Sequence, residues 1–208
     1  KDALLLKARA TKDAAEIVRM RRMGQITTQV VGQVADFLSS HRAKNEVLVK
    51  KAGQPLTIAD VKSKINLWLV EKGAENPEGT IFAIGRDAGV PHSSGNPEDL
   101  LKLGQTIVFD IFPCEQGGGY YYDFTRTWCL GYAPERAASL YEDVHSAYKQ
   151  IMSELKADTP CADYQKRVSQ IFEQQGHATV ESNPDTQEGY VHSLGHGLGL
   201  RVHERPWF

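Results

Sequence analysis

The sequence predicts an α+β fold built from two similar halves. Helical segments are separated by short runs of β-branched and aromatic residues. The order long helix, short helix, strand and histidine loop occurs twice, with His92 nineteen residues after Gly73 and His196 twenty residues after Gly176. We interpret this order as a diverged internal duplication, although common spacings in α+β proteins would give the same pattern by coincidence. No linker or low-complexity stretch interrupts the chain, so residues 1–208 are expected to form a single domain.

The first half contains two predicted helices and a strand. Hydrophobic residues at helical spacing predict a long helix that opens at Thr11. The run Thr57–Asp60 resembles a capping arrangement, which predicts a second helix from there to Gly73. The apolar run Ile81–Ile84 predicts a strand that leads into the loop carrying His92.

A predicted hairpin in the middle of the chain carries two aspartates. The run Thr106–Phe109 indicates a buried strand that ends in Asp110. A glycine-rich turn precedes a second strand-like run, Tyr120–Trp128, which contains Asp123. Two carboxylates held close together in apolar surroundings repel each other unless a cation lies between them, so the hairpin favours a metal site. The alternative is that Asp123 pairs with Arg126 and that Asp110 caps a turn.

The second half repeats the helical pattern. Pro134 is predicted to start a long helix, which continues to about Lys156. A shorter helix is predicted over Cys161–Gln175, where Gly176 ends it. The β-branched run Ala178–Val180 predicts a strand directly before the histidine-rich end of the chain.

The run Val191–Glu204 contains three histidines and three glycines. A helix is disfavoured because each glycine costs about 1 kcal/mol relative to alanine. In a strand, His192 and His196 would share one face, and the glycines would lie on the other, where a neighbouring backbone can approach closely. His203 lies an odd number of positions after His196, so in a regular strand their side chains would point to opposite faces. If both reach one site, a bulge or turn is expected at the glycines between them. The alternative is a glycine-rich turn with incidental surface histidines.

These two clusters together predict a metal centre. Histidine is the commonest metal ligand and also the side chain best suited to proton transfer near neutral pH. A mixed set of carboxylate and imidazole ligands suits Mn²⁺, Zn²⁺, Co²⁺ or Fe²⁺ and does not select among them.

The segments FDIFPCEQGGGYYYDFTRTW and HSLGHGLGLRVHE resemble the signature of the pita-bread metallopeptidases. This family comprises methionine aminopeptidase, aminopeptidase P, prolidase and creatinase. The resemblance covers nearly the whole chain and implies two pseudo-symmetric αβ halves around a central antiparallel sheet. It also implies two divalent metal ions and a metal-activated water that hydrolyses the N-terminal peptide bond. The second motif is more similar to the proline-directed branch, which predicts Xaa-Pro peptides or dipeptides as substrates.

The resemblance assigns metal ligands to named residues. Asp110, Asp123 and His196 match metal ligands of the family, and Thr125 is expected to hold one of these ligands in orientation. The spacing between the two aspartates is slightly longer than is usual, which indicates an insertion at the hairpin tip. The family also uses two glutamates beyond the histidine motif, and the sequence ends at Phe208. We therefore expect a catalytic domain that is incomplete at its C-terminus and lacks an N-terminal domain.

The resemblance also assigns substrate contacts. His92 and His203 match histidines that donate hydrogen bonds to the scissile amide and the developing oxyanion, where one donor can contribute about 3 kcal/mol. His192 resembles an accessory histidine of the substrate pocket. Three alternatives remain: a metal-free relative such as creatinase, a methionine aminopeptidase-like enzyme, and a non-catalytic pita-bread module that binds proteins.

Composition argues against other classes of protein. The net charge is −2 and no long basic stretch occurs, so neither nucleic acid nor a membrane is expected as a partner. No apolar run approaches the length of a transmembrane helix. Cys114, Cys129 and Cys161 form an odd, unpatterned set, which indicates reduced thiols in a cytoplasmic protein. A peptide substrate is the expected partner, and a homodimer is expected because family members are often dimers.

Overall fold

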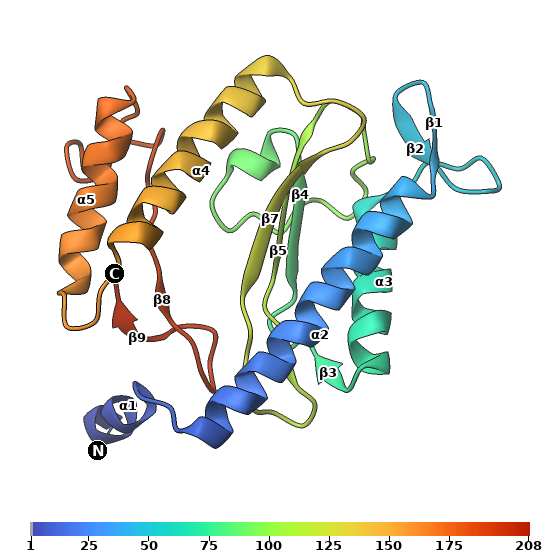
Figure 1. Ribbon diagram of the computed structural model, residues 1–208. Coiled ribbons are helices and arrows are strands. Elements are labelled where there is room, and N and C mark those ends of the chain that lie inside the picture. Colours follow the sequence, from blue (N-terminus) through green and yellow to red (C-terminus); the bar gives the residue numbers. More distant parts are fainter. Residues whose placement is uncertain (1) are drawn as a thin grey trace. The chain divides into compact units, whose positions relative to one another are not determined.

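The computed structural model describes residues 2–208, which divide into two compact units. The first unit extends to Pro134 and includes Leu198–His203. The second unit comprises Glu135–Gly197 and Glu204–Phe208. The chain therefore passes from one unit to the other after Pro134, after Gly197 and after His203. Figure 1 labels most of the helices and strands of both units.

The first unit begins with two helices. Helix α1 (Asp2–Arg9) precedes the long helix α2 (Ala14–Ser39). Helix α2 has Asp13 as its N-cap, whereas the sequence predicted an opening at Thr11. Asp13 accepts a hydrogen bond from the amide of Glu16, whose carboxylate accepts one from the amide of Asp13. Thr11 has alanine three residues later and is unable to form this reciprocal capping box.

Helix α3 (Ile58–Glu71) begins at the predicted cap. Thr57 and Asp60 form a capping box, and Gly73 follows the helix with a φ of 71°, a conformation that glycine adopts without steric cost. Both ends of this helix were therefore predicted from the sequence. Short strands flank α3: β1 (Arg42–Lys44), β2 (Val47–Val49) and β3 (Ala74–Glu75).

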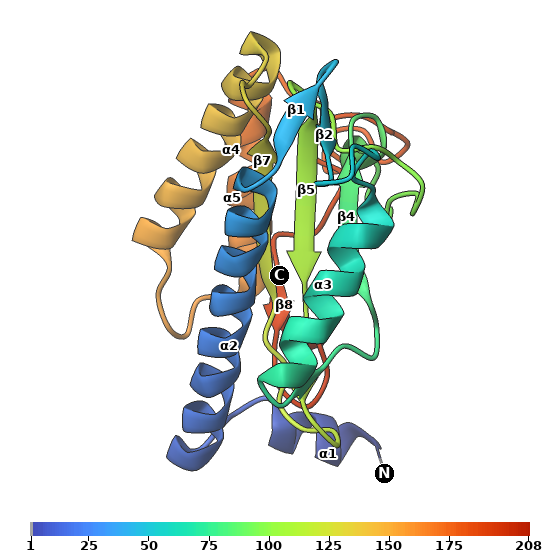
Figure 2. The ribbon, with the colours of Figure 1, turned by 90° about the vertical axis from the view of Figure 1, so that its right-hand side faces the viewer.

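A three-stranded antiparallel sheet of order β4-β5-β7 forms the centre of the first unit. Its strands are β4 (Thr80–Ile84), β5 (Thr106–Ile111) and β7 (Phe124–Cys129). Alternate side chains of β5 are buried, ending with Phe109 and Ile111, and each contributes about 1.5 to 3 kcal/mol. They belong to one apolar core with α2 and α3, which lie side by side in Figures 1 and 2. Asp110 therefore lies on the opposite face of β5, which confirms a buried strand that carries a carboxylate.

The predicted hairpin is present, but its second strand begins at Phe124 rather than Tyr120. Strands β5 and β7 pair antiparallel, with Asp110 opposite Thr125. The amides of residues 120–122 are bonded elsewhere, so this segment does not join the sheet. Their acceptors are the Glu115 carboxylate and the carbonyls of Gly199 and Pro113. The intervening strand β6 (Cys114–Glu115) pairs with β3 instead of β7.

The second unit contains a helix pair, α4 (Glu135–Glu154) and α5 (Cys161–Gln174), close to the predicted bounds. The two helices lie side by side in Figure 1. Ala147 and Ile151 of α4 pack with Val168 and Phe172 of α5 in a separate apolar cluster. Helix α5 ends before Gly176, whose φ is 86°.

Helix α4 also carries a stripe of exposed apolar side chains at helical spacing, here called the α4 stripe. Each of these side chains is 48% to 61% exposed. The α4 stripe consists of Leu140, Tyr141, Val144, Tyr148 and Met152.

No helix within residues 2–208 combines the length and apolar character needed to cross a membrane.

The strand predicted over 178–180 is wrong. Only Thr179 takes part in β structure, through an isolated parallel bridge to Tyr190. The Thr179 hydroxyl accepts from the amide of Ser182, and its carbonyl accepts from the amide of Asn183. These bonds close a turn and so compete with an extended strand.

The histidine run is a strand over only two residues, whereas an extended strand from His192 was predicted. Strand β8 (His196–Gly197) pairs antiparallel with β9 (Glu204–Trp207). The amide of Leu194 bonds to the side chain of Gln165 on α5, at 2.7 Å, instead of joining a ladder. The chain reverses between Gly197 and Glu204, which confirms the expected turn between His196 and His203.

Candidate active site

Asp110 is held by its neighbour across the β5–β7 pair. The Thr125 hydroxyl donates a hydrogen bond to Asp110 Oδ1 at 2.6 Å. Asp110 is half-buried within a strand, so it does not cap a turn. Asp123 is also half-buried and precedes β7 directly. Arg126, the alternative partner considered for Asp123, lies with its guanidinium 3.8 Å from the centre of the Phe124 ring.

His196 is half-buried at the start of β8, and its hydrogen bonding selects one tautomer. Its Nδ1 lies 2.9 Å from the carbonyl oxygen of Gly197. Because a carbonyl only accepts, Nδ1 donates in this hydrogen bond, and in the neutral ring Nε2 is then the nitrogen with the lone pair that a metal requires. Gly197 is necessary here, since a Cβ on it would lie 2.0 Å from the carbonyl oxygen of Arg205 on β9. The predicted close backbone approach at a glycine is therefore confirmed.

His192 has the same local pattern but is exposed. Its Nδ1 lies 2.9 Å from the carbonyl of Ser193, so in the neutral ring the proton is again on Nδ1 and the lone pair on Nε2. The residue belongs to the second unit, like His196.

His92 occupies a constrained turn in the first unit. The amide of Ser93 bonds to the carbonyl of Val90, and Pro91 and His92 are the two central residues. His92 has a φ of 60°, a left-handed conformation that costs a residue with a Cβ about 1 to 3 kcal/mol. Asn45, Glu46 and Asp158 also have a positive φ, so this conformation is compatible with the role that the motif gives His92 but does not by itself mark a site.

Two contacts hold the His92 loop against the sheet. The carbonyl of Ser94 accepts from the amide of Phe82 on β4. A Cβ on Gly95 would lie 2.2 Å from the carbonyl oxygen of Phe82, so glycine permits the close approach. The exposed side chain of His92 is thus presented by a loop fixed to β4.

His203 is exposed and belongs to a segment, Leu198–His203, that packs within the first unit. The carbonyl of Gly199 accepts from the amide of Tyr121 at 2.8 Å. Gly199 follows His196 by three residues, and Tyr121 precedes Asp123 by two. The histidine motif is therefore bonded directly to the aspartate hairpin.

The sequence profile of the metallopeptidase family M24 matches residues 18–208. The chain belongs to this family. The probable dipeptidase PepE of Mycobacterium tuberculosis is 26% identical over 204 residues, covering 98% of this M24 chain and 48% of the relative. The Xaa-Pro dipeptidase of Pyrococcus horikoshii is 30% identical over 148 residues, covering 71% of this chain and 39% of the relative. The M24 chain thus spans about half the length, or less, of the curated relatives it matches.

Solved structures agree with this assignment. The X-Pro aminopeptidase from Thermotoga maritima superposes with a TM-score of 0.78 at 21% identity, covering 100% of the M24 chain and 52% of the neighbour. The dipeptidase PepE from Mycobacterium ulcerans has a TM-score of 0.77 at 26% identity, covering 99% and 48% respectively. The predicted α+β pita-bread fold is confirmed by these matches.

The donor chemistry of the M24 chain fits divalent metal ions. Asp110 is oriented by a hydroxyl, and His196 has the tautomer that ligation requires. The two aspartates belong to the first unit and His196 to the second. Between residues 2 and 208, no three His, Cys, Asp or Glu side chains gather as a group that could hold a metal ion. The ligand roles of these residues remain predictions.

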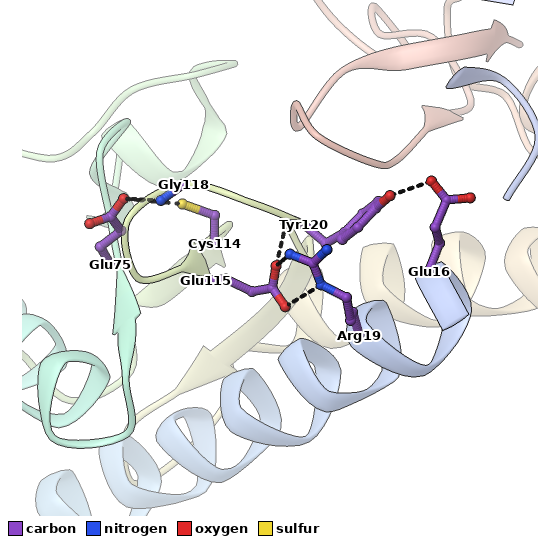
Figure 3. A network of polar contacts seen from close by, with 7 residues as sticks. All are labelled: Glu16, Arg19, Glu75, Cys114, Glu115, Gly118 and Tyr120. Atoms are coloured by element: carbon purple, nitrogen blue, oxygen red, sulfur yellow. Dashed lines mark hydrogen bonds and ion pairs between the residues drawn. The ribbon is translucent and has the colours of Figure 1, made fainter. Parts of the chain in front are cut away.

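The structure contains a polar network that sequence reasoning missed (Figure 3). Arg19 on α2 forms two hydrogen bonds with the Glu115 carboxylate, and the Tyr120 hydroxyl donates to the carboxylate of Glu16. Hydrogen bonding to Arg19 lowers the pKa of Glu115, and hydrogen bonding to Tyr120 lowers the pKa of Glu16. The bond to Glu16 raises the pKa of Tyr120 to about 12. No local sequence signal marks these pairs, because 96 and 104 residues separate the partners.

Cys114 lies near this network but is poorly suited to act as a nucleophile. It is buried, and burial raises the pKa of its thiol, which lowers the thiolate fraction at neutral pH. Its sulfur lies 3.9 Å from the Glu75 carboxylate. These facts argue against a catalytic role for Cys114.

Proposed function

We propose that the protein containing this chain hydrolyses the N-terminal peptide bond of Xaa-Pro peptides or dipeptides with two divalent metal ions. Membership of the M24 family and the Xaa-Pro names of relatives and structural neighbours support this reaction class. The observation that carries the proposal is the hydrogen bond between Tyr121 and Gly199, because it joins the segment after His196 to the segment before Asp123.

Each site residue has a role that its surroundings support. Asp110, Asp123 and His196 would hold the ions, with Thr125 fixing one oxygen of Asp110. Bound there, divalent ions supply the Lewis acidity that activates water and polarises a peptide carbonyl. Hydrogen bonds already orient the Asp110 carboxylate and the His196 imidazole. These two ligands would therefore need little reorganisation when a metal ion binds.

The remaining histidines would bind substrate. His92 and His203 are exposed and would donate hydrogen bonds to the scissile amide and to the carbonyl oxygen as negative charge develops on it. His192 would contribute to the substrate pocket. The turn at His92 and its contacts with Phe82 would fix the backbone from which this imidazole projects.

The decisive experiment measures Mn²⁺-dependent release of the N-terminal residue from an Xaa-Pro dipeptide and an Xaa-Pro-Yaa tripeptide. Cleavage is expected, and the ratio of the two rates separates dipeptidase from aminopeptidase activity. Asp123→Asn should lower kcat/KM by more than about 100-fold, since even partners of metal ligands contribute about 10- to 100-fold. Asp36→Asn, the same change on the exposed side of α2, should leave the rate unchanged.

Three other outcomes would replace the proposal. Preferential cleavage of a Met-Ala peptide would indicate a methionine aminopeptidase-like enzyme. Activity that survives both chelation and Asp123→Asn would indicate a metal-free relative of the creatinase type. Absence of hydrolysis of any of these peptides, with substoichiometric bound metal, would indicate a non-catalytic module that binds proteins.

The setting of the reaction is also a proposal. Cys114, Cys129 and Cys161 are free thiols, which supports a cytoplasmic location because reducing compartments keep thiols unpaired. The expected homodimer would be measured by analytical ultracentrifugation, where a monomer mass would contradict it.

A further inference from the structure

The chain between β5 and β7 leaves the sheet, so its return to Asp123 needs other supports. Residues 120–122 donate no amide to β5, although only Asp123 separates them from β7. Their backbone pairs instead through a single isolated bridge between Tyr121 and Cys114. One isolated bridge holds a segment less firmly than a full ladder does, so further contacts determine how far the segment can move. The described contacts supply three such anchors, one at each of the three successive tyrosines.

Tyr120 is the first anchor. It is only 4% exposed, and its hydroxyl donates a hydrogen bond to the Glu16 carboxylate near the start of α2. The capping box at Asp13 fixes Glu16 itself, because the same side chain accepts the amide of Asp13. The hydroxyl is therefore bonded to a group whose own position is set by the helix.

The Arg19–Glu115 pair supports the same tyrosine from two sides. The Arg19 guanidinium lies 4.8 Å from the centre of the Tyr120 ring, and Glu115 Oε2 accepts the Tyr120 amide at 3.0 Å. Arg19 also bonds both oxygens of Glu115, a planar two-point contact that lysine is unable to reproduce. Backbone, ring and hydroxyl of Tyr120 are thus each held, as Figure 3 shows.

The next two tyrosines extend the anchoring to Asp123. The amide of Tyr121 bonds to Gly199, in the segment that carries His203. The amide of Tyr122 bonds to Pro113, and its ring lies so close to α2 that a Cβ on Gly24 would be 2.7 Å away. Asp123 is the next residue along the chain.

We propose that Tyr120 is a positioning residue which, through Glu16 and the Arg19–Glu115 pair, fixes the backbone of Asp123 before any metal binds. This inference rests on the proposed function, because it takes Asp123 to be a metal ligand. Tyr120 touches neither substrate nor metal in this role; it acts through the backbone of the three residues that follow it. A preorganised ligand binds metal more tightly because less ordering remains to be done on binding.

The test compares Tyr120→Phe with the unmodified protein that contains this chain, by two measurements. The variant keeps the ring under Arg19 and removes only the hydroxyl. We expect Mn²⁺ affinity, measured by titration calorimetry, to fall about tenfold, the lower end of the range for groups that orient metal ligands. Hydrogen exchange of the metal-free protein should be faster at the amides of residues 121–124 and unchanged in α3. Arg19→Lys should produce the same pattern, since lysine keeps the charge and loses the two-point contact.

Tyr148→Phe is the matched control, the same chemical change on an exposed side chain of α4. A purely structural contact would lower the free energy of unfolding of Tyr120→Phe without changing the Mn²⁺ affinity of the folded protein, and that result would overturn the inference. Asp123→Asn separates the two proposals: if it leaves Mn²⁺ affinity unchanged, the proposed metal site is wrong. In that case the positioning role of Tyr120 is judged by hydrogen exchange alone. Unchanged exchange at the amides of residues 121–124 in Tyr120→Phe would refute this role.

Discussion

Thr125 and Asp110 are opposite each other on β7 and β5, and one hydroxyl hydrogen bond joins them. We expect Thr125→Val to weaken Mn²⁺ binding about tenfold, because Asp110 then loses the donor that orients its carboxylate. The substitution keeps the β-branched shape, so the strand should remain intact. Thr127→Val, two residues along on the same strand, is the control and should leave the Mn²⁺ affinity unchanged. Equal affinities for the two variants would refute the role given to Thr125.

The bond between Tyr120 and Glu16 should make stability depend on pH at both extremes. The pKa of Tyr120 is raised from 10.0 to about 12, so its contribution is complete below pH 10 and lost as the pH rises towards 12. The pKa of Glu16 is lowered from 4.5, so its contribution is present above pH 4.5 and lost as the pH falls further. Urea unfolding of the unmodified chain and of Tyr120→Phe should therefore converge above pH 10 and below pH 4.5. A constant difference across this range would contradict the assignment.

Single residues were predictable from sequence where their chemistry is local. The capping pair Thr57 and Asp60 follows from residue types three apart, and the strand that carries Asp110 follows from its apolar run. The partner of Tyr120 did not follow, because Glu16 lies 104 residues away and no spacing rule links them. The roles of Asp123 and His203 rest on a family motif, and Asp123→Asn tests the first of them.

Helix α2 contains two glycines whose environments differ, which gives an internally controlled test of packing. Gly32 has no atom within 4 Å of an added Cβ, so Gly32→Ala should stabilise the chain by about 0.5 to 1 kcal/mol. A Cβ on Gly24 would lie 2.7 Å from the Tyr122 ring, so Gly24→Ala should destabilise by about 1 to 3 kcal/mol despite the better helix propensity. Chemical denaturation measures both, and stabilisation by both would refute the contact between α2 and Tyr122.

Elements were predictable where backbone hydrogen bonds stay within the element. Helices α3, α4 and α5 agree with their predicted spans because periodicity and end signals point the same way. The strands predicted after Gly176 failed because side chains take the backbone bonds there, such as Gln165 of α5 on the amide of Leu194. The alternation of apolar and polar residues that predicts a strand does not show which distant side chains will bond to its backbone.

The two units are connected by three chain crossings, so we expect the whole chain to unfold in one transition, as a single domain would. Ile65→Val in the first apolar core and Ile171→Val in the second should each cost about 1 kcal/mol. Both should shift the same transition in differential scanning calorimetry, since neither unit consists of one continuous stretch of chain. Two separate endotherms, each moved by only one of the variants, would refute the single domain.

At the scale of the whole chain, the alternation of helical segments with strand-like runs predicted the α+β fold. The sequence did not predict that Leu198–His203 returns to the first unit, where the carbonyl of Gly199 accepts a hydrogen bond from the amide of Tyr121. This bond joins segments that are distant in sequence and have no complementary pattern.

The α4 stripe has a practical consequence for handling the protein. Environment-sensitive dyes such as anilinonaphthalene sulfonate fluoresce on exposed apolar surface, so they should bind the native chain and give a high starting signal in dye-based melting assays. Tryptophan emission is the better reporter. Trp68 and Trp128 belong to the first unit and Trp207 to the second, so intrinsic fluorescence samples both without an added probe.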